Sequence, residues 1–408
     1  MTAALAVAEH GYEVDLVETG EELGGNLLWL GATIEGHDLR PLLDESRQKI
    51  ERHPLIHVHR RTQMIGTFGQ VGRYVTTVEN SEGQAATLAH GVTILATGGR
   101  EAATELYHHG DSPAVVTQKE FERQLSDQAI DARQLESVVM IQCVGSREEP
   151  RNYCSRVCCT AALKHALNLK KQHPGIAVYV LYRDMMTYGF SEAYYTRARA
   201  ADVVFIQYEP AAKPEVVLEG QADTGGKPLA VKTFDPILNQ EVQIDADLVV
   251  LATGIVPQLP ADLVRGFGAD LDRDGFFQEA ESKWRPVDSI TEGVFACGLS
   301  LAPHSVPEAV ATAEAAAQRA LRILNHEQLP SGKVVASVRH SLCSLCERCI
   351  DACPYGARSI DPELEQVTVN PVMCQGCGAC AAVCPNSASI LEGFTPQQMF
   401  DIIDAAMV

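Results

Sequence analysis

The sequence predicts an α/β fold that is followed by a small cysteine-rich α+β module. Two observations support this fold class. An apolar strand followed by Ala-Thr-Gly occurs twice, ending at Gly98 and at Gly254, and strand and helix patterns alternate between the copies. Eight of the 13 cysteines form two identically spaced groups between Cys343 and Cys384. The 408 residues are enough for two or three domains with separate cores.

The N-terminal segment has the pattern of the second half of a dinucleotide-binding unit. Residues 1–10 form an amphipathic helical pattern that ends at Gly11, and an apolar strand over Tyr12–Val17 leads to Glu18. In such units an acidic residue after the second strand binds the ribose hydroxyls. No strand and no Gly-x-Gly-x-x-Gly loop precede the helix. We therefore interpret the sequence as starting at an internal methionine or as truncated.

A glycine turn and the first Ala-Thr-Gly copy follow this segment. Gly24, Gly25 and Asn26 form a turn that suits the passage of a nucleotide phosphate, and Thr97 with Gly98 ends the first copy. The strands of this region are expected at residues 55–59, 73–79 and 92–96. We take the five named residues as candidate cofactor contacts.

The region between the two copies reads as an inserted α/β domain. Helices are expected at 118–127, from the cysteines to about residue 171, and at 190–200; strands are expected at 137–142, 177–182 and 203–207. Alternating apolar positions over 213–244, with turns at 224–226 and 239–240, predict a hairpin sheet. No phosphate-binding glycine loop follows the strand 137–142, and four cysteines stand in its place.

The second copy leads into another strand-to-helix turn. Thr253 and Gly254 end the second copy, and a strand over 293–297 is followed by an alanine-rich helix to about His326. Pro307 suits the first position of that helix. The turn before the helix supplies four further candidate cofactor contacts: Gly298, Pro303, His304 and Pro307.

The cysteine-rich module repeats the spacing C-x2-C-x2-C-x3-C-P, which is typical of ferredoxins with two [4Fe–4S] clusters. In this pattern three cysteines wrap one cluster and the fourth completes the other. We expect one cluster to be held by Cys343, Cys346, Cys349 and Cys384, and the second by Cys374, Cys377, Cys380 and Cys353. Gly376 and Gly378 allow the second loop to bend closely. Zinc sites use four ligands in two pairs, which does not suit this doubled run.

Four cysteines of the inserted domain are candidates for a third cluster. Cys143 is expected to end a strand, Cys154 lies in a loop, and Cys158 and Cys159 open the next helix, whose N-terminus favours an anionic group. The spacing differs from that of a ferredoxin. Two alternatives stay open on spacing alone, namely buried free cysteines and a vicinal Cys158–Cys159 disulfide.

Taken together, these stretches resemble the A-subunit family of heterodisulfide reductases. The resemblance rests on Cys143-Val-Gly-Ser-Arg147, on Tyr153-Cys-Ser-Arg-Val-Cys-Cys159, on Tyr182-Arg-Asp-Met-Met-Thr-Tyr-Gly189 and on the double ferredoxin run. It covers nearly the whole chain. The two Ala-Thr-Gly strands with Glu18 are similar to two-dinucleotide-domain flavoproteins of the thioredoxin reductase type.

The resemblance implies an FAD, two ferredoxin-type [4Fe–4S] clusters and one further [4Fe–4S] cluster at Cys143, Cys154, Cys158 and Cys159. It also implies partner redox subunits in a complex that bifurcates or confurcates electrons. Two departures stand out: the glycine loop for FAD is missing, and His304 stands where many members carry a lysine. His304 could donate to the flavin with a pH-dependent charge or be a solvated loop histidine. We expect a form with the glycine loop to hold FAD tightly and the chain as written to hold it weakly.

The resemblance divides the chain into five segments. We expect residues 1–100 and 246–328 to form an FAD-binding domain, 101–245 an inserted domain with the third cluster site, 329–394 a ferredoxin domain and 395–408 a C-terminal helix. The boundary before the ferredoxin domain is marked by Pro330, Ser331 and Gly332. We favour packing of the C-terminal helix on its own module over docking to a partner.

Composition limits the possible partners and compartment. Lys+Arg 33 against Asp+Glu 53 gives a net charge of −20, which argues against nucleic acid and anionic membranes. No apolar run reaches the ~18 residues of a spanning helix and no signal peptide is visible. Thiolate ligands suggest a reducing cytoplasm, and oxygen-labile clusters an anaerobe. The alternatives to an electron-transfer oxidoreductase subunit are an NAD(P)H-dependent enzyme of the glutamate synthase small-subunit type and a flavin-free iron–sulfur carrier.

Overall fold

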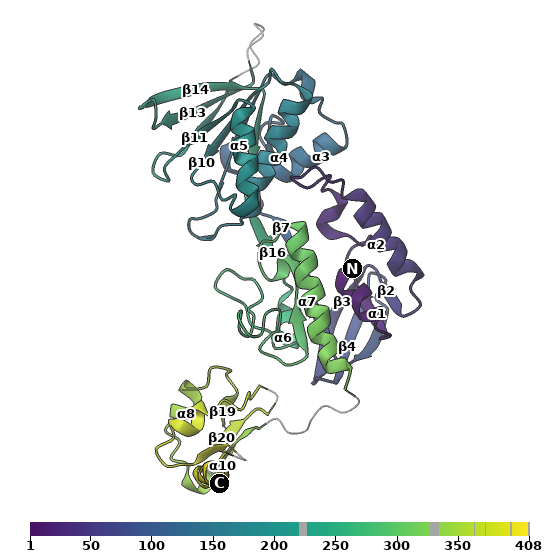
Figure 1. Ribbon diagram of the computed structural model, residues 1–408, viewed down its shortest axis with the longest axis vertical. Helices are drawn as coiled ribbons and strands as arrows, with labels where there is room; N and C mark the ends of the chain where they lie inside the picture. The colour runs from purple at the N-terminus through teal and green to yellow at the C-terminus, as the bar shows by residue number, and fades with distance from the viewer. Residues whose placement is uncertain (220–226, 327–333, 363, 372, 392–393, 407–408) are drawn as a thin grey trace.

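The computed structural model of the chain describes residues 1–219, 227–326, 334–362, 364–371, 373–391 and 394–406. These residues form three bodies along the long axis of the molecule (Figure 1). An α/β domain lies at one end, a body built from the segments on either side of that domain lies in the middle, and the cysteine-rich module lies at the other end.

The middle body is built around two long-range strand pairs and an antiparallel sheet. Its helices are α1 (Thr2–Ala8), α2 (Arg40–Arg52), α6 (Ala261–Gly266) and α7 (Val306–Leu324). Its strands are β1 (Val14–Val17), β2 (Ile56–His59), β3 (Thr62–Gln70), β4 (Arg73–Asn80), β5 (Ala85–His90), β6 (Thr93–Leu95) and β17 (Val294–Ala296). β1 pairs in parallel with β2, β6 pairs in parallel with β17, and β3 to β5 form the antiparallel sheet. Helices α1 and α7 pack together over a core that includes Leu95, Phe295 and Ala316.

A two-stranded ribbon joins the middle body to the inserted domain. Each Ala-Thr-Gly turn leads directly into one of its strands, β7 (Gly99–Glu101) or β16 (Ile255–Pro257), and the two strands pair antiparallel. Gly98 and Gly254 have φ of 78° and 86°, a backbone conformation that glycine adopts without strain. Because the two strands are antiparallel, the two turns lie at opposite ends of this ribbon between the domains.

The inserted domain contains a parallel sheet with the strand order β11-β10-β9-β15-β8. These strands are β8 (Val115–Thr117), β9 (Ser137–Ile141), β10 (Ala177–Tyr182), β11 (Val203–Gln207) and β15 (Leu248–Leu251). The helices are α3 (Gln118–Ser126), α4 (Val157–Gln172) and α5 (Glu192–Ala200), and an antiparallel sheet consists of β12 (Glu215–Leu218), β13 (Leu229–Asp235) and β14 (Gln240–Ala246). β9 and β15 are buried throughout, as continuous apolar strands of a parallel sheet should be.

Several sequence-based expectations need correction. The sequence places β15 in the FAD-binding segment 246–328, but this strand pairs with β8 and β9, so the sheet of the inserted domain extends to Leu251. Pro307 occupies the second rather than the first position of α7, because Ser305 caps that helix. β9 ends at Ile141, so Cys143 lies beyond the strand in the loop. The expected turn at 224–226 and the boundary residues Pro330 to Gly332 lie outside the described residues.

The cysteine-rich module has two similar halves. Its strands pair antiparallel as β18 (Ala336–Val338) with β21 (Ser389–Leu391), and as β19 (Arg358–Asp361) with β20 (Gln366–Val369). Its short helices are α8 (Arg348–Asp351) and α9 (Ala379–Ala382), and α10 (Pro396–Ala406) follows at the C-terminus. The small core mixes apolar side chains with cysteines, among them Val367, Cys349 and Cys380.

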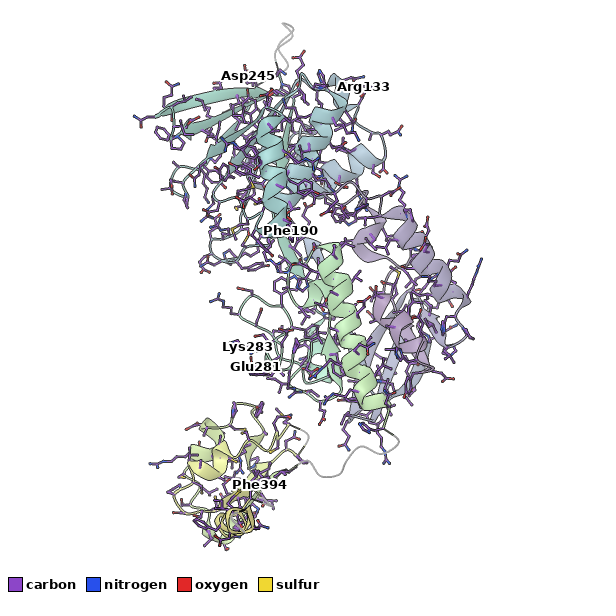
Figure 2. The ribbon with its side chains drawn as sticks, in the orientation of Figure 1. Arg133, Phe190, Asp245, Glu281, Lys283 and Phe394 are labelled. Atoms are coloured by element: carbon purple, nitrogen blue, oxygen red, sulfur yellow. The ribbon has the colours of Figure 1, made fainter. Side chains whose placement is uncertain are left out.

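Charged side chains cover much of the surface, in keeping with the net charge of −20. Arg133 and Asp245 mark this surface at the far end of the inserted domain (Figure 2). Among the helices of the described residues, none combines the length and hydropathy that crossing a membrane requires.

Candidate redox centres

The structure gathers the first four predicted ligands around one cavity of the cysteine-rich module. A cavity with about 350 Å³ of empty volume is lined by Cys343, Cys346, Cys349 and Cys384. Three of these cysteines come from the loop that leads into α8 and from α8 itself, and Cys384 follows α9 in the other half. Residues far apart in sequence therefore converge in the grouping that the ferredoxin spacing predicts.

The second four ligands gather around an equivalent cavity. Its empty volume is about 320 Å³, and its lining includes Cys374, Cys377, Cys380 and Cys353. Gly376 and Gly378 have φ of 64° and 77°. A Cβ atom on Gly376 would stand 2.4 Å from the backbone oxygen of Val334, so only glycine fits there.

Backbone N–H groups point at several of these sulfurs. Ala388 and Ser389 donate to Sγ of Cys384 over 3.2 and 3.4 Å, and Ala357 donates to Sγ of Cys353 over 3.3 Å. Burial would raise the pKa of Cys384, but these backbone donors outweigh it and lower that pKa. Such hydrogen bonds stabilise negative charge on sulfur, as cluster ligands require.

The sulfurs of the described residues do not form a site for a single metal ion. Within the described ranges, no three His, Cys, Asp or Glu side chains lie close enough to hold one. A four-iron cube separates its thiolates more widely than a single ion does, so this finding does not argue against clusters in the two cavities. All 13 cysteines are free thiols, including Cys158 and Cys159.

The inserted domain brings its own four cysteines together. Cys143 and Cys154 lie in the loop between β9 and α4, and Cys158 and Cys159 lie in the first turn of α4. Burial raises the pKa of Cys158, and the charges of Cys159, Cys143 and Cys154 raise it further. Burial likewise raises the pKa of Cys159 to about 11. The raised pKa values mean that the thiolate form of these buried cysteines is disfavoured on its own. Because a bound metal deprotonates a coordinating thiol, a metal group would stabilise the thiolate form at this site.

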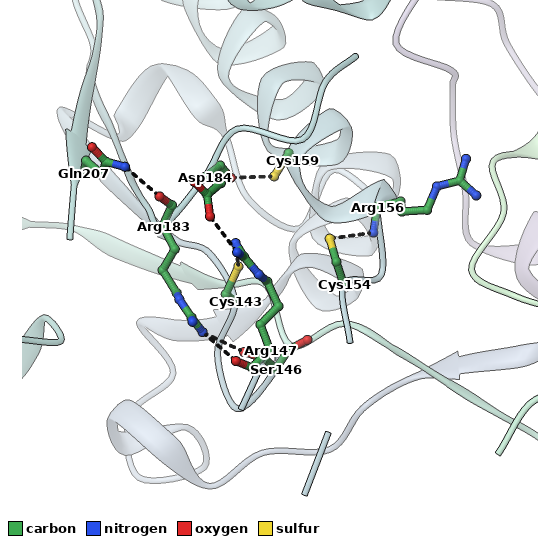
Figure 3. A network of polar contacts seen from close by, with 9 residues as sticks. All are labelled: Cys143, Ser146, Arg147, Cys154, Arg156, Cys159, Arg183, Asp184 and Gln207. Carbon is green, nitrogen blue, oxygen red and sulfur yellow. Dashed lines mark hydrogen bonds and ion pairs between the residues drawn. The ribbon is translucent and has the colours of Figure 1, made fainter. Parts of the chain in front are cut away.

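Arginines surround these cysteines. The guanidinium of Arg147 approaches Sγ of Cys143 at 4.0 Å and pairs with Asp184 at 2.6 Å (Figure 3). Arg183 donates to the backbone oxygens of Ser146 and Arg147 over 3.2 and 3.1 Å, which closes the loop over the site. The positive charges offset the negative charge that four thiolates would bring together.

The loop that carries the cysteines is wound unusually tightly. Cys143, Arg147 and Arg156 have positive φ values of 58°, 60° and 60°. A non-glycine residue in this region costs about 1 kcal/mol or more, and such strain is concentrated at functional sites. The tight winding allows the backbone N–H of Arg156 to donate to Sγ of Cys154 over 3.3 Å (Figure 3).

This loop is interlocked with the second Ala-Thr-Gly turn. Arg151 donates to the backbone oxygen of Thr253 over 2.7 Å, and the hydroxyl of Tyr153 donates to the backbone oxygen of Ile255 over 2.8 Å. Ser155 Oγ accepts from the backbone N–H of Ile255 over 2.8 Å. The cysteines and the turn predicted to contact FAD are therefore parts of one hydrogen-bonded unit.

Of the predicted FAD contacts, Asn26 lies beside the first Ala-Thr-Gly turn at one end of the ribbon, and Thr253 with Gly254 lies at the other end. Asn26 donates its side-chain amide to the backbone oxygen of Gly99 over 3.0 Å, which joins the 24–26 turn to the first Ala-Thr-Gly copy. The hydroxyl oxygens of Thr97 and Thr253 are buried without a partner among the described residues. Buried hydroxyls without partners are costly, so both turns suit a polar ligand such as FAD.

The other predicted FAD contacts lie in the turn before α7, in the first turn of α7 and directly after β1. Gly298 has a φ of 67°, and the ring of His304 bonds its backbone oxygen over 3.1 Å, so this histidine is held in the turn instead of standing free in solvent. Pro303 is buried and Pro307 is exposed in α7. Glu18 accepts from the backbone N–H of Gly20 over 2.6 Å and is half-buried after β1.

A salt bridge links the cysteine loop to α7. Arg156 pairs with Glu308 over 2.5 Å and also contacts Tyr188. Glu308 belongs to the capping box of α7, where it accepts from the backbone N–H of Ser305 over 2.8 Å. The sequence does not predict this link, because Arg156 and Glu308 are 152 residues apart. It also does not single out Arg147 or Arg183, because no spacing pattern marks these arginines.

Comparison with known proteins identifies the family of the cysteine-rich module. Residues 342–388 match the family of 4Fe-4S dicluster domains. This match covers both groups of four predicted ligands in the cysteine-rich module.

Longer matches are to heterodisulfide reductases. The chain is 35% identical over 266 residues to the A-subunit of the Ferredoxin:CoB-CoM heterodisulfide reductase of Methanosarcina acetivorans, covering 64% of this chain and 32% of that protein. It is 33% identical over 317 residues to a heterodisulfide reductase A-subunit-like protein of Archaeoglobus profundus, covering 69% of this chain and 44% of that protein. The chain thus spans less than half the length of these curated relatives.

Solved structures with the same fold are flavoproteins. The thioredoxin reductase of T. acidophilum superposes with a TM-score of 0.55 at 16% identity, covering 80% of this chain and 95% of that one. The thioredoxin reductase of Lactococcus lactis gives 0.54 at 17% identity, covering 79% and 95%. At such identities the likeness establishes the fold alone, and it confirms the predicted two-dinucleotide-domain architecture.

Proposed function

The chain is a relative of the A-subunit of heterodisulfide reductases, and we propose that it is an FAD- and iron–sulfur-containing oxidoreductase subunit that relays electrons between the flavin and partner redox subunits. The observation that carries this proposal is the interlocking of the four-cysteine loop with the second Ala-Thr-Gly turn. Such a contact would put a one-electron group directly beside the region predicted to hold a flavin.

In this proposal the residues of the chain position cofactors instead of transferring protons. FAD supplies a group that accepts electrons in pairs or singly, and each cluster exchanges one electron at a time. Thr97, Thr253 and the N-terminus of α7 would hold the flavin, where the helix dipole favours negative charge on the reduced ring. The proposed ligands of the third cluster are Cys143, Cys154, Cys158 and Cys159, with Arg147 and Arg183 offsetting their charge.

The exchange of electron pairs for single electrons at this junction is the step that bifurcation or confurcation needs. The names of two relatives pair ferredoxin with the CoB-CoM heterodisulfide, which are one-electron and two-electron partners. We propose that this chain splits or merges electron pairs in the same way within a larger complex. The ferredoxin module would exchange single electrons with the partner subunits.

Iron and flavin analysis of the purified chain tests this function. Anaerobically prepared protein that has been incubated with excess FAD should contain about 12 Fe per chain for three clusters, together with bound, extractable FAD. Cys158→Ala should remove about four Fe, because it deletes a ligand of the third cluster. Cys297→Ala provides the matched control, since Cys297 is a buried free thiol that belongs to none of the three groups.

The possible results separate the alternatives. A wild-type value near eight Fe that Cys158→Ala leaves unchanged would remove the third cluster from the proposal. Full iron with no extractable flavin would favour a flavin-free carrier. Rapid bleaching of the bound flavin by NADPH would favour a pyridine-nucleotide enzyme.

A further inference from the structure

A buried arginine lies in the ferredoxin module at a position that none of the motifs marks. Arg358 begins β19, four residues after Pro354, and only 5% of its surface is exposed. Its terminal nitrogens Nη1 and Nη2 are buried and have no hydrogen-bond partner among the described residues. This guanidinium is positively charged at any pH at which proteins fold.

A buried charge of this kind requires a counter-charge. Moving an ionised group out of water costs several kcal/mol unless an opposite charge or hydrogen bonds replace the lost hydration. Because the two terminal nitrogens have no hydrogen-bond partner among the described residues, they are available to a group outside the polypeptide. The position of the side chain indicates where that group lies.

Arg358 lies between the two cysteine cavities. It lines the cavity of Cys343, Cys346, Cys349 and Cys384, and it also lines the cavity of Cys353, Cys374, Cys377 and Cys380. No other described residue belongs to the lining of both cavities. Arg358 therefore borders the two places at which thiolates and inorganic sulfide would concentrate negative charge.

We propose that Arg358 is the shared counter-ion of the two ferredoxin-type clusters and that its buried charge raises the reduction potentials of both. This inference rests on the proposed function, because it assumes that the two cavities hold clusters. Reduction adds one negative charge to a cluster, and a fixed positive charge in a low-dielectric surrounding stabilises the reduced form. Since Arg358 lines both cavities, it would act on both clusters at once.

The test is a redox titration of the full-length, anaerobically reconstituted chain, followed by electron paramagnetic resonance. The signals of the two clusters are identified by their changes in Cys343→Ala and Cys374→Ala variants. Arg358→Met removes the charge while keeping an unbranched chain, and Arg358→Lys keeps the charge. Arg348→Gln is the matched control, because Arg348 lines the first cavity only and is exposed to solvent.

We expect Arg358→Met to lower the ratio of reduced to oxidised cluster at a fixed potential at least tenfold for both clusters. A tenfold change corresponds to about 59 mV for a one-electron couple. Arg358→Lys should recover most of this shift. Arg348→Gln should cause a smaller shift, confined to one cluster, because solvent screens its charge.

Unchanged potentials in Arg358→Met, or equal shifts in the methionine and lysine variants, would overturn the proposal. If the methionine variant loses its clusters while the lysine variant keeps them, the charge is needed to hold the clusters, which supports the role as counter-ion. If the lysine variant loses them too, Arg358 acts through its shape and the proposal is wrong. Failure of the proposed function is a separate result, since the wild-type module would then lack the roughly eight Fe of two clusters.

Discussion

At the scale of single residues, Gly254 sets how closely the cysteine loop approaches the second Ala-Thr-Gly turn. Its φ is 86°, and a Cβ atom on it would stand 2.7 Å from Oγ of Ser155. Ser155 in turn accepts the hydrogen bond from the backbone N–H of Ile255. One glycine thus permits the contact on which the proposed passage of electrons depends.

We predict that Gly254→Ala loosens this contact. The substitution adds backbone strain of about 1 kcal/mol and displaces Ser155, for a total destabilisation of about 2–4 kcal/mol. Urea unfolding of the inserted domain, followed by far-ultraviolet circular dichroism, measures the loss. The iron bound at the four-cysteine site should fall in parallel, because Cys154 is next to Ser155 in the loop.

Gly110→Ala is the control for backbone strain. Gly110 has a φ of 94°, but a Cβ atom there would meet nothing within 4 Å. We expect a destabilisation of about 1 kcal/mol and unchanged iron. Equal effects of the two substitutions would show that the approach of Ser155 has no importance of its own.

At the scale of elements, a buried carboxylate connects the start of the chain to helices α3 and α4. Glu122 accepts from the backbone N–H of Gly31 over 3.0 Å and contacts Nε2 of His165 and Nζ of Lys164 at 2.5 and 2.7 Å. Lys164 donates to the backbone oxygen of Ala32 over 3.1 Å. Burial alone would raise the pKa of Glu122, but His165 and Lys164 together lower it to about 2.

We predict a stability loss on acidification that depends on Glu122. Because the folded-state pKa of about 2 lies below the ordinary value of 4.5, the contribution is complete above pH 4.5 and is lost as the pH falls towards 2. Its size is on the order of 3 kcal/mol. Glu122→Gln should remove this part of the pH dependence and destabilise the protein near pH 7.

The fluorescence of Trp29 provides the measurement for this prediction. Trp29 lies close to Gly31 in the same segment, and its indole N–H donates to Oδ1 of Asn26 over 3.2 Å. The second tryptophan, Trp284, is 80% exposed, so its replacement by Phe isolates the signal. Identical acid titrations of the wild-type chain and Glu122→Gln would show that the buried carboxylate does not hold this segment.

The elements also show which parts of the fold local sequence can predict. The buried strands β9, β10 and β15 have continuous apolar runs, and the sequence predicts them nearly to the residue. The sequence does not predict which strands pair. Nothing in the run at 248–251 indicates that it pairs with β8 and β9 instead of with strands of the middle body. Helix α2 escapes prediction, since only Leu43 and Ile50 of its 13 residues are buried.

The candidate sites divide in the same way. Ligand cysteines follow a fixed spacing, so the sequence predicts their grouping around two cavities. Arg358 has no such spacing, and its burial between the cavities arises only when β19 takes its place in the folded module. The pair of Arg156 and Glu308 likewise exists only because the inserted domain and α7 meet in three dimensions.

At the scale of the whole molecule, the candidate redox centres lie in different parts of the structure. The four-cysteine loop lies where the inserted domain joins the middle body, and the ferredoxin module lies at the far end of the molecule (Figure 1). An outlying module with exposed Cys346 and Cys377 is accessible to a partner protein. We therefore propose that electrons enter or leave the molecule through this module.

We predict that Cys374→Ala abolishes electron exchange with a partner protein while the flavin stays bound. Cys374 is a buried ligand of the second cavity, and without it one cluster of the proposed exit is lost. The measurement is the rate at which a small ferredoxin oxidises the reduced, flavin-loaded chain in a stopped-flow instrument. Cys297→Ala is the control, because it removes a buried thiol and leaves every proposed cluster ligand in place. If the Cys374→Ala chain still reacts at the rate of the control, electrons leave directly from the junction of the inserted domain and the middle body, and the ferredoxin module has another task.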